Sequence, residues 1–214
     1  MYKTIFSFII LLFIFSACDA QEAWKLKSDR DNIKTYAKRV ADSKINAVKI
    51  ESVFPASLTQ FVSVILDIGS YDKWIYNSRS TRVVKQVSPA DVYYYSEVAF
   101  PWPTANRDFV SHITVRQDAQ TKIVYVDANN VSGLVPVKPN IVRIARSSGR
   151  WIITPQAKNQ VKVEYVLEVD PGGDLPAWLI NPFASKGLVE TFKNLRLRLQ
   201  KTDYASVHLP FIKD

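Results

Sequence analysis

Stretches that alternate apolar and polar residues recur along much of the chain. Alternation with a period of two is typical of half-buried strands, and the Gly, Pro, Asn and Asp residues between the stretches indicate turns. The connections are mostly short, which favours antiparallel pairing of successive strands. We therefore predict one antiparallel sheet, with strands at residues 33–40, 45–54, 81–87, 92–100, 107–116, 123–128, 141–145, 151–154 and 161–169.

A helical period replaces the alternation in two places. After Ser57, a suitable helix cap, apolar residues return every three or four positions, and Gly69 ends the segment. A second short helix is expected around Trp74. The pattern returns at the C-terminus, where Pro176 fits the first turn of a long amphipathic helix and Pro182 is expected to kink or restart it. The apolar stripe of this helix consists of Leu188, Phe192, Leu195 and Leu199.

The order of elements is strands, short helices, many strands and a long helix, which is typical of an α+β fold. Helices should cover one face of the sheet. A strongly curved sheet around one long helix would leave a hollow between them, and this hollow is the expected ligand site.

The first residues have the features of an export signal. Lys3 is followed by an apolar run from Ile5 to Phe15 and by small residues before Cys18, the one cysteine of the chain. Two cleavage sites are open: a lipoprotein site, at which Cys18 is lipidated, and ordinary cleavage after Ala20. We expect a signal peptide at 1–17, a tether at 18–23, one domain at 24–202 and a tail at 203–214, in an exported protein of the periplasm or cell envelope. No second apolar run is long enough for a transmembrane helix.

Composition and charge narrow the function classes. The chain is 47% hydrophobic and 12% aromatic, which suits an aromatic-lined cavity, although a β-rich fold also raises the aromatic share. Its net charge of +8 fits either simple solubility or attraction to anionic membrane surfaces. It has no block of five Lys or Arg residues, which argues against nucleic-acid binding. His112 and His208 lie far apart, and no metal, nucleotide or GxSxG motif is present. We expect no metal, no cofactor, no enzymatic activity and a monomeric state.

Four segments in the same order resemble the START family of lipid-transfer domains, especially its phosphatidylcholine-binding branch. The resemblance covers residues 24–202 and rests on the helix ending at Asp67, Glu97–Val110, Ile141–Pro155 and Asp170–Asn181. It implies a helix-grip fold, with a curved antiparallel sheet wrapped around the C-terminal helix, and an internal tunnel for one lipid. Asp72 and Ile75 stand where the phosphatidylcholine-binding members have a phosphate-binding pair, so that specificity is not carried over.

The candidate ligand-binding residues begin with a charged pair. If Trp102 is the centre of its turn, Glu97 pairs with Arg107 across a hairpin. The resemblance places this pair inside the tunnel, where it would meet the polar end of the ligand; the alternative is an ion pair at the rim. Tyr93 and Tyr95 share a strand face with Glu97 and would then point inward as well.

The other candidates come from different segments. Tyr165 lies on the apolar face of the last strand, and Trp178 belongs to the Asp170–Asn181 segment. Trp102, between Pro101 and Pro103, fits either a gate loop that touches the membrane or a core position under the C-terminal helix. Arg143 fits either a ligand contact or an ion pair on the sheet.

Three functions are compatible with the sequence. The first is binding of one lipid or other hydrophobic molecule, with transfer between membranes as an extension. The second is a helix-grip enzyme of the cyclase or hydratase type, in which Glu97 would be the base. The third is a domain that binds another protein. The basic residues of the C-terminal helix form either a solvated face or a surface for anionic lipid; they are Lys186, Lys193, Arg196, Arg198 and Lys201.

Overall fold

The computed structural model describes residues 23–214, apart from residues 42, 44, 157–158 and 174. The expected signal peptide and Cys18 therefore lie outside the described residues, as does all of the tether except its last residue. No helix of the described part is long and apolar enough to cross a membrane.

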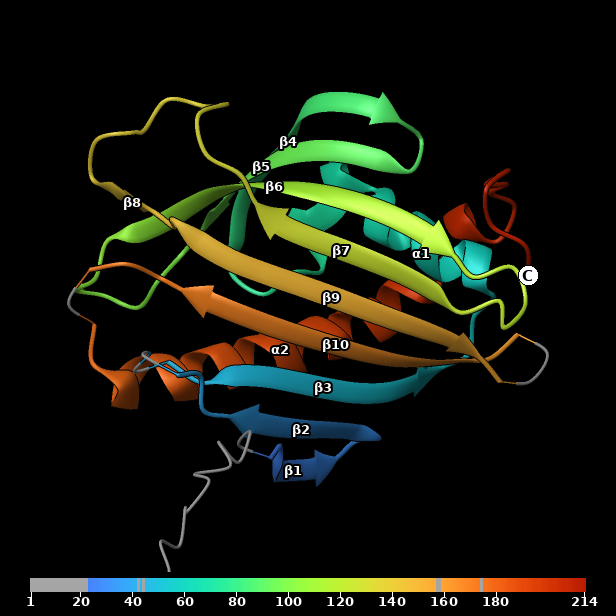
Figure 1. The fold of residues 1–214 in the computed structure, drawn as a ribbon, viewed down its shortest axis with the longest axis horizontal. Helices are drawn as coiled ribbons and strands as arrows, with labels where there is room; N and C mark the ends of the chain where they lie inside the picture. The colour runs from blue at the N-terminus through green and yellow to red at the C-terminus, as the bar shows by residue number, and fades with distance from the viewer. Residues whose placement is uncertain (1–22, 42, 44, 157–158, 174) are drawn as a thin grey trace, which may run out of the picture.

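A curved sheet of ten strands forms the body of the protein (Figure 1). Its order is β1-β2-β3-β10-β9-β7-β6-β5-β4, with antiparallel neighbours, and β8 pairs with β6 in the parallel direction. The strands are β1 (Lys25–Arg30), β2 (Ile33–Lys38), β3 (Ala47–Phe54), β4 (Ser78–Ser88), β5 (Asp91–Val98), β6 (Asn106–Gln117), β7 (Val124–Asn130), β8 (Ile141–Arg143), β9 (Arg146–Pro155) and β10 (Val161–Asp170).

Strand β1 was not predicted. It is an edge strand with almost all its side chains exposed, so it has no alternation of apolar and polar residues to reveal it. The turn to β2 contains Asp31 and Asn32 with φ values of 57° and 59°. Two successive positive φ angles form the tight turn that fits the twist of a hairpin, and this turn fixes β1 against β2.

Two helices lie on one side of the sheet, behind it in Figure 1. In α1 (Leu58–Leu66) the Ser57 side chain accepts a hydrogen bond from the Gln60 amide (3.2 Å), so the predicted cap is confirmed. The 3₁₀ segment η1 (Ile68–Lys73) follows. The long helix α2 (Ala177–Leu199) continues through Pro182, so the predicted restart there is wrong. The α+β fold with a curved sheet around the C-terminal helix is confirmed.

An aromatic cluster joins α2 to the sheet and to α1. Phe54 of β3 lies 5.2 Å from Phe61 of α1, and Trp151 of β9 stacks on Phe192 of α2 at 5.6 Å, both measured between ring centroids. All four side chains are buried. Complete burial of a large apolar side chain contributes about 1.5–3 kcal/mol, so this cluster fixes the C-terminal half of α2 firmly.

The last residues pack back onto the domain. Tyr204, in the 3₁₀ turn η2 (Thr202–Tyr204), donates a hydrogen bond to Asp67 (2.5 Å) and accepts one from Arg198 (2.8 Å). Ile212 is buried, and a carboxylate oxygen of Asp214 accepts a hydrogen bond from the amide of Thr59 in the first turn of α1 (2.8 Å). The segment expected as a tail therefore holds α1 and the end of α2 together.

Candidate functional site

The space between the sheet and α2 contains a cavity of about 220 Å³. The inward-facing residues of the central strands form its wall on one side, and the N-terminal half of α2 forms the other. Residues of the wall include Tyr94, Phe109, Trp151, Tyr165 and Leu167 from the sheet, and Phe183, Ala184 and Leu188 from the helix. The hollow expected from the order of the elements is thus present, and aromatic rings line much of it.

The described wall of this cavity has no charge. It contains no Asp, Glu, Lys, Arg or His among the described residues, and its polar atoms belong to hydroxyl, indole and backbone groups. Burial raises the pKa of Tyr94 to about 12, although a hydrogen bond with Ser111 acts in the opposite direction. Burial also raises the pKa of Tyr165. Both phenols are therefore neutral at physiological pH.

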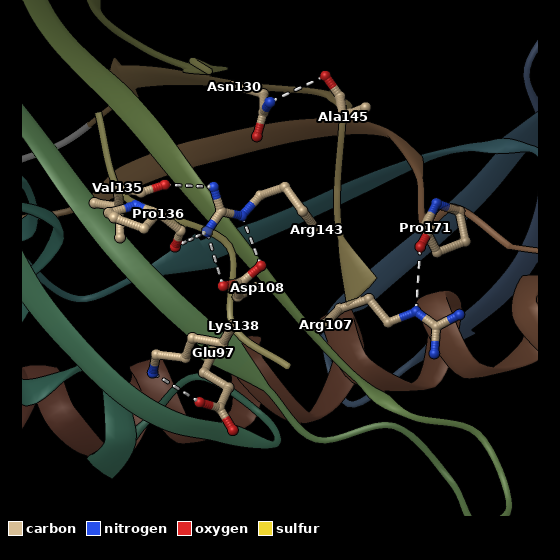
Figure 2. Close-up of polar contacts among 10 residues, drawn as sticks. All are labelled: Glu97, Arg107, Asp108, Asn130, Val135, Pro136, Lys138, Arg143, Ala145 and Pro171. Atoms are coloured by element: carbon tan, nitrogen blue, oxygen red, sulfur yellow. Dashed lines mark hydrogen bonds and ion pairs between the residues drawn. The ribbon is translucent and has the colours of Figure 1, made fainter. Parts of the chain in front are cut away.

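The predicted pairing of Glu97 with Arg107 is wrong by one residue. Glu97 lies opposite Asp108, and Val98 lies opposite Arg107. The amide of Thr104 donates to the carbonyl of Pro101 (3.0 Å), so the turn is centred between Trp102 and Pro103 and not on Trp102. A shift of one residue moves a side chain to the other face of the sheet. Figure 2 shows Glu97 and Arg107 pointing apart.

Arg107 lies on the inner face but outside the cavity wall. It is 2% exposed, and its guanidinium donates to the carbonyls of Pro171 (3.1 Å), Gly172 (3.1 Å) and Ala105 (Figure 2). Its guanidinium carbon is 4.6 Å from the ring centroid of Phe100, which does line the cavity. Burial lowers the pKa of Arg107. This arginine joins the loop before α2 to the sheet, and its donors face backbone carbonyls.

Glu97 belongs to the outer face of the sheet. Its carboxylate lies 3.5 Å from the ammonium of Lys138 and accepts a hydrogen bond from the Asn106 amide (3.3 Å). Tyr93 and Tyr95 share this face, because they alternate with the inward-facing Tyr94. The prediction that Glu97, Tyr93 and Tyr95 line the hollow is therefore wrong.

Arg143 forms the ion pair that was considered as its alternative role. Its guanidinium donates to both carboxylate oxygens of Asp108, at 2.6 and 3.0 Å, and to the carbonyls of Val135 and Pro136 (Figure 2). The Asp108 carboxylate raises the pKa of Arg143 further. This bidentate pair fixes the loop at residues 131–140 on the outer face, away from the cavity.

Both candidate tryptophans lie on the surface. Trp102 is 92% exposed and Trp178 is 76% exposed, so the core position considered for Trp102 is wrong. The ring of Phe100, at the start of the same loop, is 4.9 Å from the ring of Phe183 in α2. The loop between β5 and β6 and the start of α2 therefore lie side by side at one end of the molecule (Figure 1).

Of the candidate ligand-binding residues, Tyr165 is the one found in the cavity wall. The residues that were missed on β5 have the opposite parity: Tyr94 and Val98. A signal was available, because Glu97 is charged and its parity is the expected solvent side of the strand.

Trp74 was predicted only as part of a short helix, yet it lines the cavity and is buried. The Asn194 side chain donates to its carbonyl (3.2 Å), and the amide of Tyr76 donates to Thr191 (3.1 Å). Two contacts from α2 therefore position the Trp74 segment. The indole nitrogen of Trp74 is buried without a hydrogen-bond partner among the described residues.

The basic face expected on α2 is largely taken up by contacts within the domain. Arg198 is buried against Tyr204 and Asp67, the Arg196 guanidinium donates to Ser52 (2.9 Å), and Lys193 lies 3.4 Å from Asp31. This favours the plainer alternative of a structural and solvated face.

Comparison with known proteins gives consistent similarities. The family model described as START domain matches residues 11–203. An uncharacterized protein of Pseudomonas aeruginosa is 31% identical over 181 residues, covering 84% of this chain and 88% of the relative. The phosphatidylcholine transfer protein of Mus musculus is 27% identical over 180 residues, covering 80% of this chain and 81% of the relative.

Solved structures agree with this result. A STAR-related lipid transfer protein fragment from Xanthomonas axonopodis superposes with a TM-score of 0.77 at 29% identity. The match covers 83% of this chain and 99% of the fragment. An aromatase/cyclase from Streptomyces has a TM-score of 0.52 at 10% identity, which shows a shared fold and no more.

Proposed function

This chain belongs to the START domain family, and we propose that it binds one molecule of a lipid or other hydrophobic ligand in the cavity beneath α2. The observation that carries this proposal is the cavity itself: about 220 Å³, lined mainly by aromatic and aliphatic side chains and bounded on one side by α2. A buried apolar space of this kind loses packing contacts when empty and gains them when an apolar molecule fills it.

Ligand binding in the cavity can be tested by filling the cavity with a larger side chain. Ala184 lines it from α2, so Ala184→Trp should occupy the space that a ligand needs. Native mass spectrometry of the protein after exposure to a total lipid extract should show one bound molecule on the wild type. We expect bound ligand to fall at least about tenfold in the variant, because a side chain and a ligand cannot share one packed volume.

A matched control is available on the same helix. Leu197 is 63% exposed and does not belong to the cavity wall, so Leu197→Trp adds a similar ring outside the site. This variant should bind ligand like the wild type. Equal occupancy in Ala184→Trp and wild type, or a wild type that takes up nothing from the extract, would refute binding in this cavity.

We further propose that the domain exchanges its ligand at a membrane. Support comes from an exposed apolar tip, which we define as Trp102, Leu134, Val137 and Trp178. These residues belong to three segments, the β5–β6 loop, the 131–140 loop and the start of α2, which all lie towards the same end of the molecule (Figure 1). Tryptophan is favoured at membrane–water interfaces. Lipidation at Cys18, expected from the leader, would keep an exported domain near such a surface, and fatty-acid labelling of Cys18→Ser would test it.

The structure does not support the enzyme alternative in which Glu97 is the catalytic base. Glu97 faces away from the cavity and pairs with Lys138, so it cannot act on a molecule held beneath α2. We therefore propose a binding function without catalysis.

A further inference from the structure

We infer that the ligand is a single-chain amphiphile, whose apolar chain fills the cavity and whose uncharged, hydroxyl-bearing head group lies in a polar groove next to it. The inference rests on the proposed function and narrows it to a class of ligand. It favours molecules of the monoacylglycerol type, and it disfavours fatty acids and lipids with two acyl chains.

The first argument is that the groove continues the cavity along the sheet. Gly149 of β9 and Leu167 of β10 are paired and line the cavity. The next pair on the same face, two residues further along each strand, is Ser147 with Val169, and this pair lines both the cavity and the groove. The groove has a volume of about 550 Å³. Because the two spaces share wall residues, one molecule can extend from the cavity into the groove.

The second argument is an unpaired strand edge in the groove. Strand β10 pairs with β9 as far as Asp170, but it pairs with β3 only as far as Leu167. In the described part of the chain, residues 168–170 therefore have no strand partner on the β3 side. The segment before β3 is attached to α2 instead, since the Asn46 amide donates to the side chain of Asn181 (2.9 Å). Backbone groups of an unpaired edge are available to bond a polar ligand or water.

The third argument is the set of polar side chains around this edge. Asn46, Ser147 and Ser148 line the groove, and their side chains make no hydrogen bond with another described residue. Their polar atoms are also absent from the described atoms that are both buried and unpaired, so they remain accessible. An amide and two hydroxyl groups both donate and accept hydrogen bonds, and a hydroxyl group on the ligand can do the same.

The fourth argument is charge. The charged residues of the described groove are Arg146, Glu168 and Asp170. Arg146 lies 2.8 Å from Asp170, and no described basic group forms an ion pair with Glu168, so the described groove has a net negative charge. The described cavity wall has no charge at all. A carboxylate or phosphate would therefore meet repulsion in the groove and no counter-charge in the cavity.

The fifth argument is size. The cavity of about 220 Å³ is below the range of about 300–1,000 Å³ that is usual for sites of drug-sized ligands. One short apolar chain suits this volume. A second chain would have to lie in the groove against charged and hydroxyl groups, where an apolar chain gains little.

Four probes with chains of the same length separate these ideas: 1-monodecanoylglycerol, methyl decanoate, decanoate and decyltrimethylammonium. The first has an uncharged head with two hydroxyl groups, the second has no hydroxyl group, the third is anionic and the fourth is cationic. Titration calorimetry near pH 8, below the concentrations at which the probes aggregate, gives their affinities. We expect 1-monodecanoylglycerol to bind the wild type at least about tenfold more tightly than each of the others.

A variant of the groove tests the position of the head group. Asn46→Leu keeps a similar volume and removes the side-chain amide, while methyl decanoate reports whether the cavity is intact. We expect the ratio of 1-monodecanoylglycerol to methyl decanoate affinity to fall about three- to tenfold, as for one lost hydrogen bond. The matched control is Gln120→Leu, which removes an exposed amide in the β6–β7 turn, outside the groove, and should leave the ratio unchanged.

The other outcomes are also decisive. An unchanged ratio in Asn46→Leu would overturn the placement of the head group in the groove. Decanoate or decyltrimethylammonium binding as tightly as 1-monodecanoylglycerol, or a two-chain lipid retained from the lipid extract, would overturn the ligand class while leaving the proposed function intact. No binding of any probe, together with no retained lipid, would refute the proposed function itself.

Discussion

At the residue scale, one position in a turn decides which side chains reach the cavity. The turn between β5 and β6 is centred between Trp102 and Pro103, and this half-step places Glu97 outside and Arg107 inside. The two charged side chains therefore have different partners. Glu97 forms a solvent-accessible ion pair with Lys138. Arg107 is buried and donates hydrogen bonds to backbone carbonyls.

These two residues should therefore differ in their effect on stability. Arg107→Leu leaves the carbonyls of Ala105, Pro171 and Gly172 without their donor, and we expect the free energy of unfolding to fall by about 3 kcal/mol. Glu97→Gln should change it by about 0–1 kcal/mol, as for a surface ion pair. Urea denaturation of both variants checks this, and equal losses would contradict the structural role of Arg107.

At the element scale, α2 has two unlike halves. Its N-terminal half lines the cavity with Ile180, Phe183 and Ala184, and the C-terminal half is buried in the aromatic core through Phe192. The chain after α2 adds a second attachment, through Tyr204 and Asp67. The N-terminal half has its own attachment, the hydrogen bond from the Asn46 amide to the Asn181 side chain (2.9 Å), whereas the Tyr204–Asp67 attachment involves an ionisable carboxylate.

This attachment should depend on pH. Burial by itself would raise the pKa of Asp67, but hydrogen bonds from Tyr204, Ser70 and Arg198 outweigh it and lower the pKa. A carboxyl with a lowered pKa in the folded state adds stability above its unfolded pKa of about 4, and this stability is lost as pH falls through the folded value.

We expect the thermal midpoint of the wild type to fall more steeply between about pH 5 and pH 2 than that of Asp67→Asn. Tyr204→Phe, which removes the 2.5 Å hydrogen bond, should flatten the same part of the profile. Parallel profiles for all three proteins would show that Asp67 carries no such linkage.

At the scale of the whole molecule, the sheet brings distant segments to one end. The apolar tip combines residues from three segments that are separated along the chain, and one of these segments is the start of α2, whose following turns cover the cavity. Membrane contact and ligand access would then occur at the same end of the protein.

This arrangement predicts where membrane binding is lost. The double variant Trp102→Ala, Trp178→Ala removes the two most exposed tryptophans of the tip, and we expect its affinity for mixed phosphatidylcholine–phosphatidylglycerol vesicles to fall by about tenfold or more. The control is Val83→Ala, Val87→Ala on edge strand β4, which removes exposed apolar side chains elsewhere. Equal effects of the two pairs in a flotation assay would contradict docking through the tip.

Much of the architecture follows from the sequence alone. Alternation, helical spacing and the break at Asp170–Gly173 predict the central strands, the capped helix α1 and the long helix α2, because these patterns record which positions are buried along each element. The resemblance of four ordered segments predicts the family. Tyr165 was placed correctly in the hollow because every second residue of β10 is apolar.

Only the tertiary structure determined which residues line the cavity. The faces of β5 and β6 depend on where their turn is centred, and Trp74 becomes part of a cavity wall only when α2 packs against it. Local patterns record the period of an element, but they do not record its register against a partner or which of its atoms remain unpaired. Those properties arise where segments distant in the chain meet, and they determine what this protein can hold.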